Sequence, residues 1–302
     1  MRGTRGIAQL LVLWALILLG TLALGFSLSM RTEAQAARNG VEDVRAYFQA
    51  RTGIQRAVML LSTLPADNVM RMAIAGEDGD ASYEVRVESE SGKVDINLVP
   101  DDVLLGILRK GGLPDDEAEG LRDAILDWRD QDERPRPRGA EAPDYAQLKE
   151  PVTPRNGNLK GVEELRYVKG VTPELYGGFL AKVFTAHGRS GQVSYLRAPE
   201  FVLRSLPGVS PEVAAWIVAN RDGETPVSAA DLAAVVGEGL TAQGLALISG
   251  GQATNVYTIT STGRAGTGVV HAVRCLAEVT GTGAKGVKIL RWLDLAPREV
   301  GG

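Results

Sequence analysis

Residues 7–30 read IAQLLVLWALILLGTLALGFSLSM, a run without a single charged side chain. As a helix, this run is long enough to cross the ~30 Å hydrocarbon layer of a membrane. Arg2 and Arg5 precede it, whereas Arg31 and Glu33 follow it as a pair of mixed charge. Because segments rich in Lys and Arg stay in the cytoplasm, we expect a cytoplasmic N-terminus, a transmembrane segment over residues 7–30 and the rest of the chain across the membrane.

The helical pattern continues beyond this segment. Proline is absent between Met1 and Pro65, and two groups of apolar residues follow helical spacings of three and four. These residues are Val41, Val44, Phe48, Ile54, Val58 and Leu61. We therefore expect one helix from about Ile7 to Leu64, whose second half packs against a downstream part of the chain. The alternative is a secretory signal peptide cleaved after Gly25, which would give a mature protein that starts at Phe26.

Composition narrows the function classes. The chain has 302 residues, of which 44% are hydrophobic, and a formal net charge of −4, so it can bury a core and lacks the basic surface of a general nucleic-acid binder. A single cysteine, Cys275, excludes an internal disulfide and a cysteine zinc site. The only histidines are His187 and His271, and no nucleophile–base pair or phosphate loop is present, so we expect no enzymatic activity. Any metal site would use oxygen ligands.

Strand-like segments occur at both ends of the part that follows the long helix. The alternating runs Tyr83–Glu88 and Val94–Leu98 are separated by Ser91–Gly92, a pattern that predicts a β-hairpin. Three further β-rich runs close the chain, over residues 256–262, 269–279 and 287–292. This order predicts an α+β fold with one antiparallel sheet, interrupted by a large helical insertion over residues 100–251.

A short unit recurs within the insertion. Residues 165–174 align with residues 203–212, and residues 108–119 form a weaker third copy. Each of the first two copies is a helix end, a glycine, an apolar residue and a Thr or Ser cap before Pro and Glu, the design of a helix-hairpin-helix motif. Such motifs often bind DNA phosphates, but the insertion has 17 Lys and Arg against 23 Asp and Glu, a balance of −6 that favours a structural role.

An acidic loop carries the strongest metal-binding signal. Asp130, Asp132 and Glu141 stand at relative positions 1, 3 and 12, the spacing of three carboxylate ligands in an EF-hand. Arg134 and Pro135 occupy positions 5 and 6, where an EF-hand needs another ligand and a glycine, so this is not an EF-hand. Two interpretations stay open: another oxygen cage, or a solvated loop whose acids are balanced by nearby arginines.

The N-terminus resembles that of type IV pilin-like proteins, which have a short basic leader ending in glycine before an apolar helix. The resemblance implies a leader over residues 1–6, removed by a prepilin peptidase that cuts between Gly6 and Ile7 and methylates the new amine. Most of these proteins carry glutamate at the fifth mature position, where this chain has Leu11. That glutamate pairs with a neighbouring subunit in the filament, and a terminal subunit could do without it.

Four segments together resemble the K component of the type II secretion system, a family of minor pseudopilins. They are DWRDQD at 127–132, GAEAPDY at 139–145, NGNLKGVEELR at 156–166 and APEFVLRSLPGVSPEVAAWIVANR at 198–221. The resemblance extends from Gly6 to about Leu295. It implies a type IV pilin-like fold: a helix continuation and first hairpin over residues 31–99, the all-α insertion with sterile-alpha-motif-like packing over 100–251, and strands completing the sheet over 252–302.

The same resemblance implies the function. Such a protein caps the tip of a periplasmic pseudopilus together with minor pseudopilins I and J, on top of a filament of the major pseudopilin, and thereby helps to export folded proteins. It is anchored in the bacterial inner membrane by a single helix, with its globular part in the periplasm, and moves into the pseudopilus after processing. Calcium is the implied cofactor, with Asp130, Asp132, Glu141 and Asp144 as candidate ligands. The alternative function is a membrane-anchored DNA-binding protein of a competence pilus.

Overall fold

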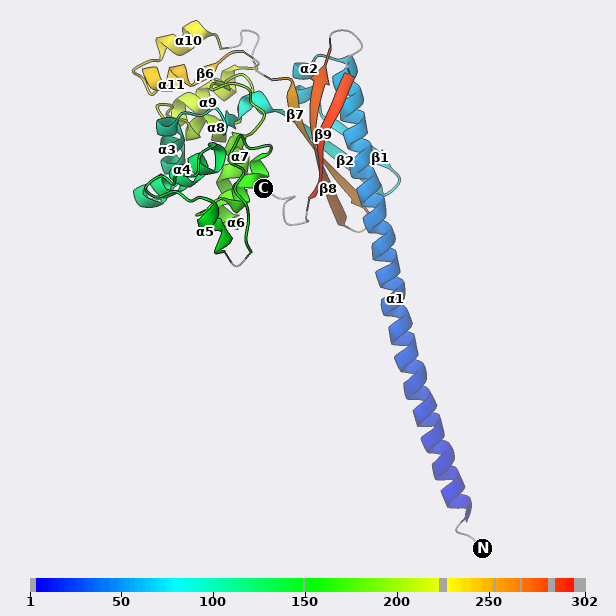
Figure 1. The fold of residues 1–302 in the computed structure, drawn as a ribbon. Coiled ribbons are helices and arrows are strands. Elements are labelled where there is room, and N and C mark those ends of the chain that lie inside the picture. Colours follow the sequence, from blue (N-terminus) through cyan, green and yellow to red (C-terminus); the bar gives the residue numbers. More distant parts are fainter. Residues whose placement is uncertain are drawn as a thin grey trace.

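One long helix dominates the computed structural model, which describes residues 4–148, 150–222, 227–251, 254–266, 268–281 and 286–295, with side chains from Leu10 onward. Helix α1 (Thr4–Thr63) has 60 residues and is about 90 Å long at 1.5 Å per residue. It ends just before Pro65, and the short α2 (Ala66–Arg71) follows. Its first half projects far beyond the globular part (Figure 1). The continuous helix expected from the sequence is confirmed.

The second half of α1 packs on the sheet through a face of small and apolar residues. Ala46, Ala50, Ile54, Ala57 and Leu61 are at most 1% exposed. The expectation that Val41, Val44 and Phe48 also pack against the downstream chain is wrong, since they are 61%, 53% and 56% exposed. At 3.6 residues per turn they lie about 150° around the helix axis from the buried face. Three of the five buried residues are alanines, whose small side chains allow the helix backbone close to the sheet.

Gly263 shows how close that approach is. A Cβ atom at this position would lie 2.0 Å from the carbonyl oxygen of Ala46 and 2.5 Å from the amide nitrogen of Ala50. Both are backbone atoms that no side-chain rotation can move away. Glycine is therefore required where strand β7 crosses α1.

A single five-stranded antiparallel sheet forms the other layer, in the order β1-β2-β7-β8-β9. Its strands are β1 (Ile74–Asp78), β2 (Ala81–Ser89), β7 (Val256–Ala265), β8 (Val269–Thr280) and β9 (Gly286–Leu295). Tyr257, Ile259, Val273 and Cys275 are buried in the core shared with α1. The sheet expected from strands at both ends of this part of the chain is thus confirmed, and burial raises the pKa of the Cys275 thiol to about 11.

The first hairpin differs from the sequence prediction. Strand β2 pairs with β1 through a turn at Gly79, which has φ +64°, rather than with residues 94–98. Ser91–Gly92 lies instead in the short helix η1 (Glu90–Gly92). The two-residue β3 (Val94–Asp95) pairs in parallel with β4 (Phe184–Thr185) of the insertion. The alternation of apolar and polar residues correctly predicted a strand at 83–88, but it did not predict which strands pair with it.

Between β2 and β7 the chain forms a helical insertion with a core of its own. Its helices are α3 (Asp101–Lys110), α4 (Asp115–Arg129), α5 (Ala142–Ala146), η2 (Val162–Tyr167), α6 (Pro173–Leu175), η3 (Tyr176–Leu180), α7 (Ala181–Val183), α8 (Glu200–Ser205), α9 (Pro211–Asn220), α10 (Ala229–Ala234) and α11 (Ala242–Ala246). The small strands β5 (Val193–Ser194) and β6 (Ile248–Ser249) pair in parallel. Val94, Ile96 and Val99 already belong to this core. In Figure 1 the insertion lies to one side of the sheet.

The three repeats expected from the sequence are hairpins between helices, with Gly112, Gly170 and Gly208 at φ values of +90°, +90° and +76°. The hydroxyls of Thr172 and Ser210 cap α6 and α9 as expected. A fourth hairpin, not found in the sequence, joins α10 to α11 through Gly237 and Gly239, both at positive φ. This hairpin has two glycines at positive φ where the other hairpins have one, so it was not recognised as a further copy of the repeat.

Candidate metal centre

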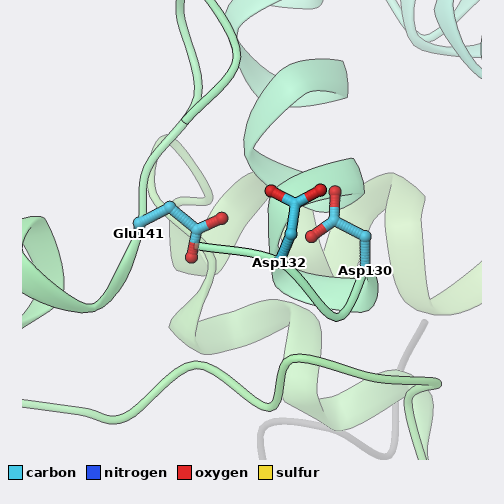
Figure 2. A group of neighbouring side chains, drawn as sticks. All are labelled: Asp130, Asp132 and Glu141. Carbon is cyan, nitrogen blue, oxygen red and sulfur yellow. The ribbon is translucent and has the colours of Figure 1, made fainter. Parts of the chain in front are cut away.

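The acidic loop connects α4 to α5 and folds back on itself. Asp130 follows the last residue of α4, Asp132 lies in the turn after it, and Glu141 directly precedes α5. Glu141 approaches from the returning side of the loop and faces the two aspartates (Figure 2). The structure therefore brings together three of the four carboxylates expected from the sequence.

These three carboxylates are close enough to share one ion. One oxygen from each lies within 4.8 Å of the others. Two calcium–oxygen bonds of about 2.4 Å on opposite sides of an ion span the same distance. Glu141 is only 1% exposed, and neither of its carboxylate oxygens has a hydrogen-bond partner in the described part of the chain. The buried Oδ1 of Asp130 likewise has none among these residues.

Glu141 therefore titrates abnormally. Burial, followed by the negative charges of Asp127, Asp130, Asp132 and Glu133, raises its pKa from 4.5 to about 7. A buried carboxylate without a donor is costly, so the arrangement favours either a proton or a cation on Glu141. The oxygen-only donor set fits a hard divalent cation such as calcium, with water completing the coordination.

A further carboxylate, Asp127, holds the loop in place, and the sequence analysis did not single it out. Asp127 is 0% exposed and accepts hydrogen bonds from the backbone N–H groups of Arg136 (3.1 Å) and Ala140 (2.9 Å) and from the Arg136 guanidinium (2.7 Å). Gly139 permits this packing, since a Cβ there would lie 1.8 Å from Oδ2 of Asp127. Position 127 within DWRDQD is on the buried face of α4, a signal that could have separated it from the solvent-exposed acids.

The remaining predicted site residues lie elsewhere. Asp144 is not in the group of three, because its Oδ2 accepts the backbone N–H of Glu141 at 3.0 Å at the start of α5. Gly6 and Ile7 lie within α1, in the half that projects away from the globular part (Figure 1). His187 follows a short strand and His271 lies in β8.

The helix-hairpin-helix units offer few free amides to a DNA phosphate. The third hairpin, at Gly208, and the fourth pair with each other: Ser210 donates its N–H to the Gly239 carbonyl and Thr241 donates to the Gly208 carbonyl, both at 2.8 Å. Lys110 donates to the carbonyls of Arg204, Leu206 and Val209 at 3.1, 2.8 and 2.6 Å. The groups that would contact phosphate are thus used inside the protein, which argues against the DNA-binding alternative.

The long helix carries the strongest membrane signal. Within Leu10–Thr63, a window of mean hydropathy 2.3 is wholly exposed in the structure. By length and composition this helix can cross a membrane. Leu11, at the position where pilin-like proteins usually have glutamate, is 66% exposed.

Part of the chain is similar in sequence to known type II secretion proteins. Residues 85–184 match the family model described as type II secretion system (T2SS), protein K. A stretch of 84 residues is 36% identical to type II secretion system protein K of Pectobacterium carotovorum subsp. carotovorum; it covers 28% of this chain and 26%, about a quarter, of that protein.

A solved structure shares the fold. One chain in the crystal structure of the GspK-GspI-GspJ complex from the enterotoxigenic Escherichia coli Type 2 Secretion System superposes with a TM-score of 0.65. The match covers 88% of this chain and 99% of that chain, at 14% sequence identity. At this identity, the likeness shows a shared fold. The match to the family model covers residues 85–184, about a third of the chain, and over this part the chain is similar to type II secretion system protein K.

Proposed function

We propose that this protein is a minor pseudopilin that caps the tip of the periplasmic pseudopilus in type II secretion and helps to initiate its assembly. The observation that carries the proposal is α1, whose second half is the core helix of a pilin-like sheet while its first half is apolar and uncovered. A helix of this kind is stable only in lipid or against other helices. Lipid before assembly and a helical filament afterwards supply the two environments.

The face of α1 that points away from its own sheet supplies the docking surface for pseudopilins I and J. Val41, Val44 and Phe48 form an exposed apolar stripe there, on the segment that follows the transmembrane run. The stripe is separated from the apolar run at residues 7–30 by residues 31–40, which include Arg31, Glu33 and Arg38. Its occupant in this proposal is the N-terminal helix of a partner pseudopilin, packed by the helix-in-groove mode.

Two features favour a terminal position. Leu11 provides no carboxylate to pair with the N-terminal amine of a neighbouring subunit. The insertion adds a second folded body beside the sheet (Figure 1), which obstructs stacking of a further subunit. The work is therefore done by surfaces, without an enzymatic step.

Calcium is the proposed cofactor, held by Asp130, Asp132 and Glu141. Its chemistry here is structural: a divalent cation offsets two of the three negative charges and ties the two sides of the acidic loop together. The support is the pair of partnerless oxygens on the buried Glu141. Asp144 acts from outside the group by fixing the first turn of α5.

The proposal requires processing of the N-terminus. A prepilin peptidase would cleave between Gly6 and Ile7 and methylate the new amine of Ile7. The processed helix can then leave the inner membrane and join the pseudopilus. The test is complementation of a strain that lacks its own copy of this protein. Gly6→Leu should leave an unprocessed precursor and reduce secretion of the system's substrates, whereas Gly3→Leu, which alters the leader away from the cleavage point, should be processed. Full processing and secretion with Gly6→Leu would refute the proposal.

A further inference from the structure

The acidic loop contains a cation of its own, the guanidinium of Arg136. Its NH1 group donates to Oδ1 of Asp127 at 2.7 Å and to Oδ2 of Asp130 at 2.5 Å. The contact with Asp130 leaves the other oxygen, Oδ1, buried and without a hydrogen-bond partner in the described part of the chain. Arg136 therefore decides which of the two Asp130 oxygens is free.

Asp127 acts on the opposite side of the loop. Through the N–H of Ala140, which is held at 2.9 Å, it fixes the residue immediately before Glu141. Asp127 makes no hydrogen bond to the three clustered carboxylates, and it is wholly buried. Its carboxylate forms an ion pair with Arg136 at 2.7 Å, and the same guanidinium also pairs with Asp130.

We propose that Asp127 and Arg136 are the positioning pair of the calcium centre: Asp127 sets the place of Glu141, and Arg136 turns Oδ1 of Asp130 toward the ion. This inference rests on the proposed calcium site and deepens it. Groups that orient metal ligands from behind typically change metal affinity 10- to 100-fold when they are removed. The pair is part of the folded loop before an ion arrives, so it lowers the ordering cost of binding.

The opposite role for a cation in this place is competition with the metal ion. An arginine that merely competes with calcium for Asp130 would weaken binding, and its removal would tighten it. The two roles therefore predict changes of opposite sign in the calcium dissociation constant.

Arg138 provides a matched control within the same loop. Its guanidinium donates to Asp116 at 2.7 Å, and its backbone N–H donates to Asp123 at 3.2 Å, so its side chain makes no contact with the three clustered carboxylates. Arg138→Gln removes the same charge from the loop without touching Asp127 or Asp130. A difference between the two variants isolates position from net charge.

The experiment is calcium titration calorimetry on the full chain in detergent micelles, with thermal unfolding in EDTA as a second readout. We expect Arg136→Gln and Arg136→Lys to weaken calcium binding about 10- to 100-fold, because neither side chain reproduces the guanidinium's geometry, while Arg138→Gln leaves it unchanged. Europium luminescence should report an additional coordinated water in the Arg136 variants, where the Asp130 oxygen is lost. This readout does not move in a merely destabilised protein.

The outcomes separate the two proposals. Unchanged or tighter calcium binding in both Arg136 variants overturns the positioning pair. Weaker binding with unchanged europium hydration also overturns it, because the ligands would then still be in place. If the wild-type chain itself binds no calcium, the proposed metal site fails, and the positioning pair fails with it.

Discussion

Replacing Glu141 by glutamine should stabilise the metal-free protein at pH 8, and calcium should reduce or reverse this advantage. The pKa of Glu141 is raised from 4.5 to about 7, so the folded state binds more protons than the unfolded state between these values. Stability therefore falls as the pH rises through this window. A shift of this size corresponds to about 3 kcal/mol of destabilisation at pH 8, which Glu141→Gln removes because glutamine does not ionise.

The assay is thermal unfolding of the full chain in detergent, at pH 5 and pH 8, in EDTA and in excess calcium. In EDTA at pH 8, Glu141→Gln should melt about 6 to 12 °C above wild type, whereas at pH 5 the difference should fall to about a quarter of this, because pH 5 lies only half a unit above the unfolded-state pKa of 4.5. Calcium at 100 times its dissociation constant adds about 2.7 kcal/mol to wild type and less to the variant, so the difference shrinks or reverses. Glu133→Gln, an exposed acid of the same loop, is the control and should show little change.

Two results would refute this reasoning. One is a lower melting temperature of Glu141→Gln in EDTA at pH 8, which would mean that the carboxylate has stabilising partners. The other is an equal difference at pH 5 and pH 8, which would mean that ionisation of Glu141 is not the cause.

Three further predictions concern other parts of the molecule. Gly263→Ala places a methyl group against the backbone of α1 near Ala46 and should lower the free energy of unfolding by about 1 to 3 kcal/mol or more, measured by thermal or denaturant unfolding. Phe48→Glu should abolish co-purification with pseudopilins I and J without changing the melting temperature, whereas Gln55→Glu, a polar residue on the same face, should reduce binding far less. Asp144→Asn should cost about 1 kcal/mol of stability in EDTA and leave the calcium dissociation constant unchanged, since its carboxylate serves the start of α5.

Sequence reasoning succeeded where one local signal decides the structure. The absence of proline before Pro65 and the apolar run at 7–30 determine α1, and alternation determines the strands at 256–265 and 269–280. The glycine and Ser or Thr caps located the repeated hairpins. The spacing of Asp130, Asp132 and Glu141 suggested a shared site, and the structure places these three carboxylates close together.

Sequence reasoning failed where contacts between distant segments decide which strands pair and which side chains are buried. Residues 94–98 alternate like a strand, but Val94 and Ile96 are taken into the core of the insertion. Val41 and Phe48 follow helical spacing, yet the sheet packs on the opposite face of α1, where Gly263 lets the backbones approach near Ala46 and Ala50. Asp127 looked like one more loop acid, since its burial depends on a turn formed nine residues later at Arg136.

The most direct test of the central claim is the native mass of the processed protein mixed with pseudopilins I and J from the same bacterium. We predict a single complex that contains one copy of each, that forms through residues 41–48 of α1 and that does not extend into a filament of this chain alone. Three proteins that each elute at their own mass, or a homopolymer of this chain, would contradict the assignment as the capping subunit.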